Sequence, residues 1–342
     1  MGSYVRAVQV QKVGGPEVMK VVQIVPPSPG PHDVLIQVMA SGINFIDTYV
    51  REGRYGHTLP LTPGQEGAGI VVETGAEVGS VMKGDRVAWC SILGTYAEFA
   101  VAPADRVVPI PPEISFEEAA AVLLQGMTAH YLSHSAYAIK AGDEVLIHAG
   151  AGGTGLLLTQ FAKSLGARVY TTVSTEAKAA LSRVAGADEV IQYTESDFGE
   201  EIKRLTSGRG VAAVFDSVGA TTFDQSLGSL KARGTLVLYG SAGGEVQPFA
   251  PIRLAPLGSL FLTRPVLKDY VATREELLAR SNSVFEAVGK GILKVRIEAK
   301  FPLEAAPKAH ETLEGRKTTG KLLLVPWGCD TSFEVGSGRG QR

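Results

Sequence analysis

A glycine-rich turn near the middle of the chain has the residue types and spacing needed to hold a diphosphate. The segment HAGAGGTG, residues 148–155, follows the apolar run EVLI and has glycines at 150, 152 and 155. In a strand-turn-helix setting, Gly150 permits the tight turn, Gly152 lets the backbone approach a pyrophosphate, and Gly155 lets the helix pack closely on the strand. Amide groups at the start of the helix then bind the phosphates. The order of strand, turn and helix, more than the spacing, favours a dinucleotide over a structural turn.

The end of the next predicted strand indicates which dinucleotide is bound. NAD-binding proteins usually have an acidic side chain there, hydrogen-bonded to the adenosine ribose. In this chain the strand ends in TTVST, and Ser174 and Lys178 supply a hydroxyl and an ammonium that suit a 2'-phosphate. Glu176 falls in the first helical turn, where an acid is also expected to complement the helix dipole. We therefore predict NADPH rather than NADH.

Candidate metal ligands are few. Two cysteines, Cys90 and Cys329, cannot build a disulfide framework or a cysteine-based zinc site, and they fit a reducing compartment. His130 and His134 share a helix face, but no third ligand is evident in the sequence. No metal is predicted.

Two patterns of secondary structure must position these residues. From residue 5 to about 110, short β-rich segments broken by Gly and Pro predict an all-β unit, a partly closed barrel. A helical region follows, with Ser115 and Glu118 as a capping box. Beyond residue 141, six strand patterns alternate with helix patterns, one of them over residues 221–234, and predict a doubly wound parallel sheet, the Rossmann form of the α/β class.

The C-terminal elements are expected to return to the first unit. They are a long helix pattern in TREELLARSNSVFEAVGKG, a β-like segment, a helix and the strand KLLLVP. The predicted domains are residues 1–124 completed by 267–328, and residues 125–266. Residues 329–342 are Gly-rich and aperiodic, and we expect a flexible tail there.

The composition excludes several classes of function. The 342 residues are 45% hydrophobic and 20% charged with a net charge of -2, so no basic field exists for nucleic acid or an anionic membrane. No apolar run approaches the roughly 18 residues that span a bilayer, and the N-terminus lacks the apolar core of a signal peptide. We expect a cytoplasmic enzyme acting on a small molecule.

With both units placed, the chain resembles the zinc-free medium-chain dehydrogenases/reductases, and specifically the NADPH:quinone oxidoreductases of the zeta-crystallin type. The resemblance covers residues 5 to about 326 and implies a GroES-like, mostly antiparallel β-barrel beside the Rossmann sheet. Zinc-dependent relatives have a histidine where this chain has Gln65. The motifs that carry the resemblance are GGPEVM (14–19), ASGINFIDTYVREGRY (40–55), PGQEGAGIV (63–71), GDRVAW (84–89), LQGMTAHYL (124–132), HAGAGGTG (148–155), DSVG (216–219), GSLFLTRP (258–265) and AHETLEGRKTTGKLLL (309–324).

The resemblance also implies a set of cofactor contacts. Tyr193 would cover the adenosine end, Arg316 would add a second cation, and Thr128 would serve the diphosphate. The whole implied set is Asn44, Tyr49, Thr128, Gly152, Gly153, Thr154, Gly155, Ser174, Lys178, Tyr193, Ser217, Tyr239, Gly240, Ser241, Phe261, Thr263 and Arg316.

The implied activity is zinc-independent reduction of a quinone by NADPH in a cleft between the domains. Asn44, Tyr49 and Tyr55 would orient the substrate carbonyl, with Tyr49 the first choice, whereas Asp47 is expected to cap or turn. A quinone can take its protons from water, so no strong acid is required. Hydride transfer itself is cofactor chemistry.

Other functions found in the same family remain alternative hypotheses. An NADPH-dependent enone or enoyl reductase would also lack zinc, and some relatives are lens crystallins or bind AU-rich RNA. The balanced charge argues against RNA. A homodimer, or a tetramer, is expected through the edge strand GSLFLTRP, because pairing would protect an exposed apolar edge.

Overall fold

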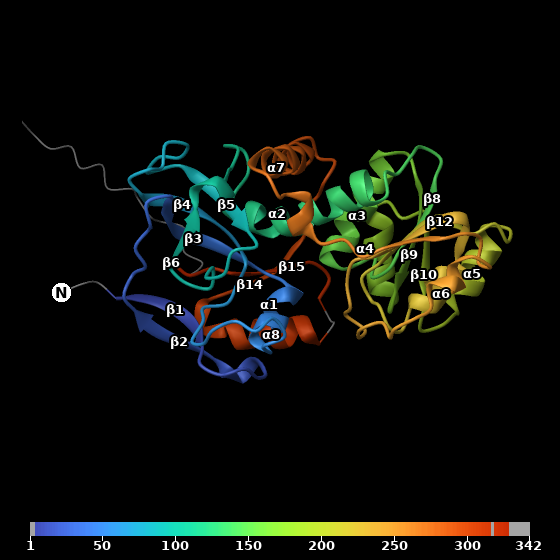
Figure 1. Cartoon of the computed structure of the whole chain (residues 1–342), viewed down its shortest axis with the longest axis horizontal. Helices are drawn as coiled ribbons and strands as arrows, with labels where there is room; N and C mark the ends of the chain where they lie inside the picture. Colours follow the sequence, from blue (N-terminus) through green and yellow to red (C-terminus); the bar gives the residue numbers. More distant parts are fainter. Residues whose placement is uncertain (1–3, 316–317, 328–342) are drawn as a thin grey trace, which may run out of the picture.

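Two sheets lie side by side along the molecule, with helices between them (Figure 1). The computed structural model describes residues 4–315 and 318–327. The predicted tail and Arg316 lie outside the described residues. None of the helices in the described ranges is long and apolar enough to span a membrane.

The first sheet confirms the predicted doubly wound form. Its six strands are all parallel and run in the order β10-β9-β8-β11-β12-β13. This order reverses between β8 and β11, and ligands bind at such a point in open α/β sheets. The strands are β8 (Glu144–Ile147), β9 (Arg168–Val173), β10 (Glu189–Gln192), β11 (Val211–Asp216), β12 (Leu230–Leu238) and β13 (Phe261–Thr263). The helices of this unit are α3 (Gly153–Ser164), α4 (Glu176–Val184), α5 (Phe198–Leu205) and α6 (Phe223–Gly228).

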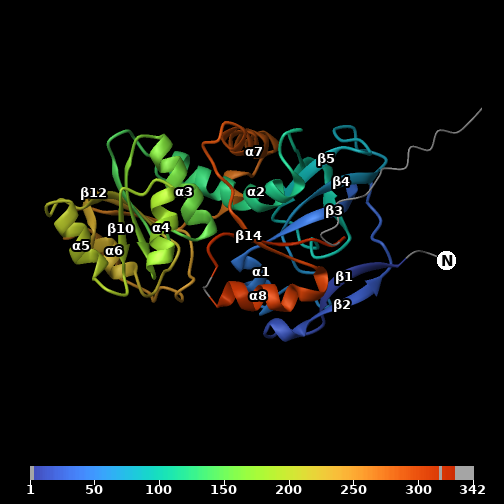
Figure 2. The ribbon, with the colours of Figure 1, turned by 180° about the vertical axis from the view of Figure 1, so that it is seen from behind.

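The second sheet is mostly antiparallel and runs in the order β14-β15-β3-β4-β5-β7, with β6 on β3. Its strands are β3 (Asp33–Ile43), β4 (Glu66–Thr74), β5 (Arg86–Cys90), β6 (Phe99–Pro103), β7 (Val108–Pro109), β14 (Ile297–Phe301) and β15 (Lys321–Leu324). A separate antiparallel pair, β1 (Val5–Val10) and β2 (Met19–Ile24), lies beside it together with α1 (Phe45–Arg51) and α8 (Ala306–Glu314), as Figure 2 shows from behind. The predicted mostly antiparallel unit is confirmed.

Strand β15 brings the C-terminal segment back to the first unit. It pairs with β3 in antiparallel register, with Leu322 opposite Ile43 and Leu323 opposite Gly42. The next position in this register puts Lys321 opposite Asn44, the residue that follows β3. Two segments far apart in sequence therefore meet where β3 ends.

Helix α2 (Phe116–Tyr131) connects the two sheets. It begins with the predicted capping box, in which Ser115 N donates to Glu118 Oε2 (3.0 Å) and Glu118 N donates to Ser115 Oγ (3.1 Å). Buried alanines at 119–121 let it pack against α3, β3, β4 and α7 (Arg274–Gly289). The predicted boundary between residues 124 and 125 falls inside this helix, and the domain boundaries stay a prediction.

The helix predicted over residues 221–234 is wrong in its second half. Helix α6 ends at Gly228, and β12 already begins at Leu230, which pairs with Val211. Arg233 has a left-handed backbone (φ 61°) beside a register shift between β11 and β12. The leucine spacing fits a helix, but pairing with β11 outweighs this local preference.

Candidate functional site

The carboxyl ends of the parallel strands gather most of the predicted cofactor residues at one edge of the sheet. Residues just beyond one strand donate backbone hydrogen bonds to the end of the neighbouring strand. The loops that follow these strands therefore lie at the same edge of the sheet. This edge is where dinucleotides bind in doubly wound folds. The bonds are Gly150 N to Thr172 O (3.0 Å), His148 N to Phe215 O (3.0 Å), Tyr193 N to Val173 O (3.1 Å) and Tyr239 N to Asp216 O (2.8 Å).

The tight turn after β8 is made by a different residue from the one predicted. Ala149, with φ 53°, adopts the left-handed conformation, and Gly150 has no positive φ. Gly150 is needed for another reason, because a β-carbon there would lie 2.5 Å from Thr171 Cβ on the neighbouring strand. The role given to Gly150 in the sequence prediction is therefore corrected from turn conformation to close packing.

The other two glycines of the turn have different surroundings. A β-carbon on Gly155 would lie 2.2 Å from the carbonyl oxygen of Ala149, so the helix packs against the turn as predicted. Gly152 is the N-cap of the 12-residue helix α3 and makes no side-chain cap hydrogen bond. A β-carbon there would meet only Ala149 O, at 3.2 Å. Gly152 is thus less crowded than Gly150 and Gly155, and its place beside the helix N-terminal amides fits the diphosphate of a dinucleotide. Gly153 and Thr154, the first two residues of α3, are half-buried.

Ser174 and Tyr193 directly follow β9 and β10, and Lys178 lies in the first turn of α4. Ser174 O accepts a hydrogen bond from Thr194 Oγ1 (3.1 Å), which places the residue after Tyr193 against the end of β9. Ser174 and Lys178 are half-buried, whereas Tyr193 is 54% exposed. Burial lowers the pKa of Lys178 from its ordinary value, and the Glu298 carboxylate opposes this shift. This hydroxyl, cation and aromatic ring suit a phosphorylated ribose and its base.

The acidic alternative, Glu176, has partners within the protein. Its carboxylate accepts from Arg183 Nη1 (2.5 Å) and from Gln192 Nε2 (3.0 Å). These contacts hold it along the surface of α4 and β10. The assignment of Ser174 and Lys178 to the cofactor stays a prediction.

The loops after β11 and β12 form the opposite end of the predicted cofactor site. A β-carbon on Gly240 would lie 2.4 Å from Ser217 O, so these two loops touch. Burial raises the pKa of Tyr239, and its hydrogen bond with Ser217 partly offsets this. Ser241 follows directly and is half-buried.

Phe261 and Thr263, both on β13, lie at different distances from the carboxyl edge of the sheet. Thr263 pairs with Val237 near the carboxyl end of β12. Phe261 pairs with Thr235, nearer the start of that strand, and is 60% exposed on the outer strand of the sheet. The structure therefore does not bring Phe261 to the edge where the other predicted residues meet, and both assignments stay predictions.

Asn44 is the centre of a buried polar cluster that the sequence did not predict. Its Nδ2 donates to Glu66 Oε2 (2.8 Å), and its Oδ1 accepts from Lys321 Nζ (2.7 Å) and Gln125 Nε2 (3.4 Å). Lys321 Nζ also donates to Glu66 Oε2 (2.6 Å). Lys321 and Glu66 are 2% and 0% exposed. Two charged residues inside the apolar segments GQEGAGIV and GKLLLVP were the available sequence signal.

Asp47 caps helix α1, as expected. One oxygen, Oδ2, accepts from Asn44 N (2.9 Å) and from Tyr96 Oη (3.2 Å), while Oδ1 is buried without a partner among the described residues. Burial raises the pKa of Asp47 to about 7. The side chain is fully buried, on the opposite face of α1 from Tyr49.

The predicted substrate tyrosines lie on and just after α1. Tyr49 is half-buried, and the Arg54 guanidinium carbon lies 4.3 Å from its ring centroid. Tyr55 is 56% exposed. Their phenol groups are therefore more accessible than the Asn44 amide, which is committed to protein partners. The roles of all three in orienting a substrate stay predictions.

Helix α2 links this region to the glycine turn. A β-carbon on Gly153 would lie 2.1 Å from Gln125 Oε1, so Gln125 lies between the turn and Asn44. Thr128, one turn further along, is half-buried, and its hydroxyl donates to Leu124 O (2.7 Å). Asn44 and the glycine turn are thus brought together through α2.

The side chains in the described ranges do not fit a zinc site. No group of three or more His, Cys, Asp and Glu side chains there is arranged to hold a metal ion. Cys90 is buried, which raises its pKa to about 12 and keeps it a thiol. The rings of His130 and His134 are stacked, 4.1 Å apart and 7° from parallel, so their in-plane lone pairs do not converge on one ion.

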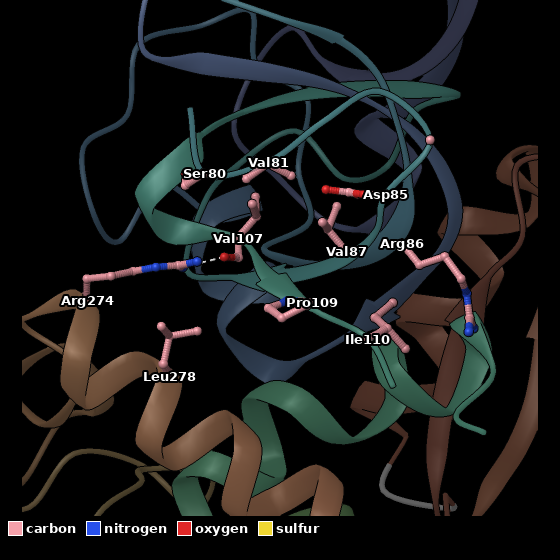
Figure 3. Close-up of a pocket in the computed structure, with 11 residues that line it drawn as sticks. Ser80, Val81, Asp85, Arg86, Val87, Val107, Pro109, Ile110, Arg274 and Leu278 are labelled. Atoms are coloured by element: carbon pink, nitrogen blue, oxygen red, sulfur yellow. Dashed lines mark hydrogen bonds between the residues drawn. The ribbon is translucent and has the colours of Figure 1, made fainter. Parts of the chain in front are cut away.

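A cavity of about 510 Å³ lies elsewhere, between β5, β7 and α7 (Figure 3). Val81, Val87, Val107 and Leu278 give it an apolar lining, and Arg274 crosses one side to donate to the carbonyl of Val107. None of the predicted site residues lines it. We therefore assign the candidate site to the sheet edge, on chemical grounds, rather than to this cavity.

Comparisons with known proteins agree with this arrangement. A model of the alcohol dehydrogenase GroES-like domain matches residues 30–112, and a model described as zinc-binding dehydrogenase matches residues 153–278. Quinone oxidoreductase 1 of Escherichia coli is 43% identical over 93% of this chain and 99% of its own. A 2-haloacrylate reductase of Burkholderia sp. is 39% identical over 94% of this chain and 99% of its own.

Solved structures give the same picture. The Escherichia coli quinone oxidoreductase complexed with NADPH has a TM-score of 0.92 at 43% identity, covering 94% of this chain and 100% of that one. A mycobacterial protein complexed with NADPH has a TM-score of 0.91 at 47% identity, with the same coverage of both chains.

Proposed function

The chain belongs to the quinone oxidoreductase family of medium-chain dehydrogenases/reductases, and we propose that it reduces quinones with NADPH. The observation that carries the proposal is the sheet edge itself. There, the sparsely contacted backbone at Gly152 supports a phosphate-binding turn, and the half-buried Ser174 and Lys178 support a partner for the 2'-phosphate.

Each end of the site would bind one part of NADPH. The amides at the start of α3 would hold the diphosphate, and Lys178 with Ser174 would hold the 2'-phosphate. The loops at Ser217 and Tyr239–Ser241 would receive the nicotinamide end. Bound NADPH supplies a hydride, and the protein supplies position and a local electrostatic environment.

The substrate side would orient the acceptor carbonyl without a strong acid. Tyr49 in the second half of α1 and Tyr55 just after the helix offer phenol groups, and Asn44 fixes the start of α1. Asp47 has a raised pKa, but it is fully buried behind α1 and donates to nothing among the described residues. A reduced quinone can take its protons from water, which agrees with the burial of Asp47.

NADPH oxidation by the purified protein tests the proposal. Rates are compared for ortho-quinones, para-quinones, enones and enoyl thioesters, with NADH in place of NADPH as the cofactor control. We expect the highest kcat/KM with a quinone and NADPH. Activity confined to enones or enoyl thioesters would reject the quinone assignment.

A second candidate function is reduction of an activated carbon-carbon double bond. The 39% identical Burkholderia relative is named for 2-haloacrylate, an α,β-unsaturated acid, so this activity is named within the same set of relatives. It would need a proton donor for carbon, which Tyr49 or Tyr55 would have to supply. The same acceptor panel separates the two activities.

A homodimer and a cytoplasmic location are parts of the same proposal. Strand β13 pairs only with β12 among the described strands. The side chains of Phe261 and Val266 at this edge are 60% and 47% exposed. A second copy pairing there would cover this apolar edge. The free, buried thiol of Cys90 is consistent with a reducing compartment.

A further inference from the structure

We propose that Lys321, paired with Glu66, is a positioning residue that acts through Asn44, holding its amide in one orientation and tying α1 to α2. This inference rests on the proposed function, because the groups it positions are those assigned to substrate and cofactor. Asn44, Glu66, Gln125 and Lys321 are called the Asn44 cluster below.

Charge fixes the direction of the Asn44 amide. An ammonium can only donate hydrogen bonds, and a carboxylate can only accept them. Lys321 Nζ lies 2.7 Å from Asn44 Oδ1, and Glu66 Oε2 lies 2.8 Å from Asn44 Nδ2. A flipped amide would point its NH2 group at an ammonium and its oxygen at a carboxylate, so only one orientation is compatible with the pair.

The same pair connects the substrate side to the cofactor side. Glu66 Oε1 accepts from Leu124 N of α2 (2.7 Å), while its Oε2 accepts from Lys321 and Asn44. The neighbouring Gln125 reaches Asn44 Oδ1 and fills the space beside Gly153 of the glycine turn. The start of α1, the middle of α2 and the phosphate-binding turn are therefore held by one set of contacts.

Stability alone does not explain a fully buried ion pair at this position. Removing two charges from water costs about as much as their attraction returns, so well-packed apolar residues of the same volume are often as stable. The directional hydrogen bonds to Asn44 are what an apolar pair would lack. Geometry at the site is therefore the property that this pair supplies.

A second ion pair offers a matched control. Lys300 Nζ of β14 lies 2.6 Å from Glu117 Oε1 in the first turn of α2, so it joins the same sheet to the same helix. Its side chains are 40% and 33% exposed, and its one hydrogen bond to Glu117 does not reach the Asn44 cluster. A lysine removed here changes the charge and a link to α2 without touching Asn44.

A double-mutant cycle tests the proposal. The variants are Lys321→Met with Glu66→Gln, Asn44→Ala, and all three changes together, with the combination of Lys300→Met and Asn44→Ala as the control cycle. Quinone kcat and KM are measured at saturating NADPH, and kcat is normalised to the number of NADPH-binding sites titrated by fluorescence. This normalisation removes losses that come only from unfolded protein.

We expect the charge-neutral pair variant and Asn44→Ala each to lower normalised kcat/KM by about tenfold to a hundredfold, the scale of a misplaced catalytic group. The triple variant should be no worse than Asn44→Ala, because both changes remove the same interaction. Lys300→Met should leave kcat/KM near that of the parent and add independently to Asn44→Ala. The proposal would be overturned if the pair variant had normal kcat/KM. It would also be overturned if the losses of kcat/KM from the pair variant and from Asn44→Ala multiplied in the triple variant.

Lys321→Arg keeps the test decisive if the pair variant does not fold. It retains the positive charge but presents a larger planar group, so NADPH binding should persist while kcat/KM falls at least about tenfold. Full activity of Lys321→Arg would also overturn the proposal. The rate of the parent with quinones decides the proposed function separately, and if the parent reduces only enones, both cycles are measured with an enone.

Discussion

Gly155 and Ala149 are in direct backbone contact, since a β-carbon on Gly155 would lie 2.2 Å from the carbonyl oxygen of Ala149. Gly152, three residues earlier, is less crowded, because its β-carbon would lie 3.2 Å from the same oxygen and meet nothing else. Two glycines of one turn are therefore retained for different reasons. Gly155 serves the packing of α3, and Gly152 leaves space for a ligand.

Alanine substitutions separate these two roles. Gly155→Ala forces backbone apart and should destabilise the fold by about 1–3 kcal/mol, the usual cost of overpacking. Gly152→Ala should unfold near the parent temperature but bind NADPH at least about tenfold more weakly, because the methyl group occupies phosphate space. Thermal unfolding and NADPH titration measure both. A large loss of stability in Gly152→Ala would contradict this division.

Lys178 is predicted to select NADPH. Lys178→Ala should raise the dissociation constant for NADPH by about tenfold or more, as expected for loss of a charge-assisted phosphate contact, while NADH binding changes little. Lys203→Ala, which removes an exposed lysine paired with Glu200 on α5, is the control and should affect neither cofactor. Equal weakening of NADPH and NADH by Lys178→Ala would refute the assignment.

The hydroxyl groups of Tyr49 and Tyr55 are predicted to orient the substrate and not to act as an essential acid. Removing the hydroxyl in Tyr49→Phe should lower quinone kcat/KM by less than about tenfold, because a neutral hydrogen bond is worth about 1 kcal/mol and no acid is required. Tyr49→Ala should also raise the quinone KM, since the ring is lost. Tyr55→Phe provides the comparison at an exposed position. A loss of three orders of magnitude or more in Tyr49→Phe, on the scale of about 10²–10⁴ for acid catalysis, would instead identify a proton donor.

Protonation of His310 is predicted to lower the free energy of unfolding at acidic pH. Burial, and then the charge of Arg51, lowers the pKa of His310 from 6.5 to about 3. The folded state therefore holds the neutral ring, and its contribution is complete above the unfolded pKa and is lost as the pH falls through the window from 6.5 to 3. Asp47, with its pKa raised to about 7, acts in the opposite direction and loses its contribution as the pH rises from 3.8 to 7.

Comparison with a His310→Gln variant isolates the histidine, since Asp47, Tyr96 and Arg51 are present in both proteins. The difference in unfolding free energy between parent and variant should shrink by about 2 kcal/mol between about pH 7 and pH 5, as one proton is linked to unfolding. Urea unfolding at the two pH values measures this. A difference that does not change with pH would show that His310 does not titrate in this way.

The edge of β13 is predicted to hold two copies together. Light scattering of the parent should give at least twice the chain mass of 36.0 kDa. Phe261→Glu introduces a charge at the exposed apolar edge and should shift the protein towards monomer. Val184→Glu, at an exposed apolar position on α4, is the control. A parent that is monomeric at micromolar concentration would remove this part of the proposal.

Local patterns in the sequence were sufficient for much of this molecule. The six alternating strand and helix patterns, the capping box at Ser115 and the spacing of Gly152 and Gly155 each depend on neighbours within a few residues, so periodicity and residue type reveal them. The same locality explains the error over residues 221–234. There the leucine spacing suits a helix, and only the pairing of Leu230 with Val211 makes it a strand.

The tertiary structure alone decided what surrounds Asn44. Lys321 and Asn44 are 277 positions apart, and they meet because β15 pairs with β3 in a register that sets them opposite one another. A shift of that register by one residue would turn Lys321 to the other face of the sheet. The sequence determined that a lysine and a glutamate stand in apolar strands. Which partners they find depends on strand pairing between distant segments, and no pattern of adjacent residues contains that information.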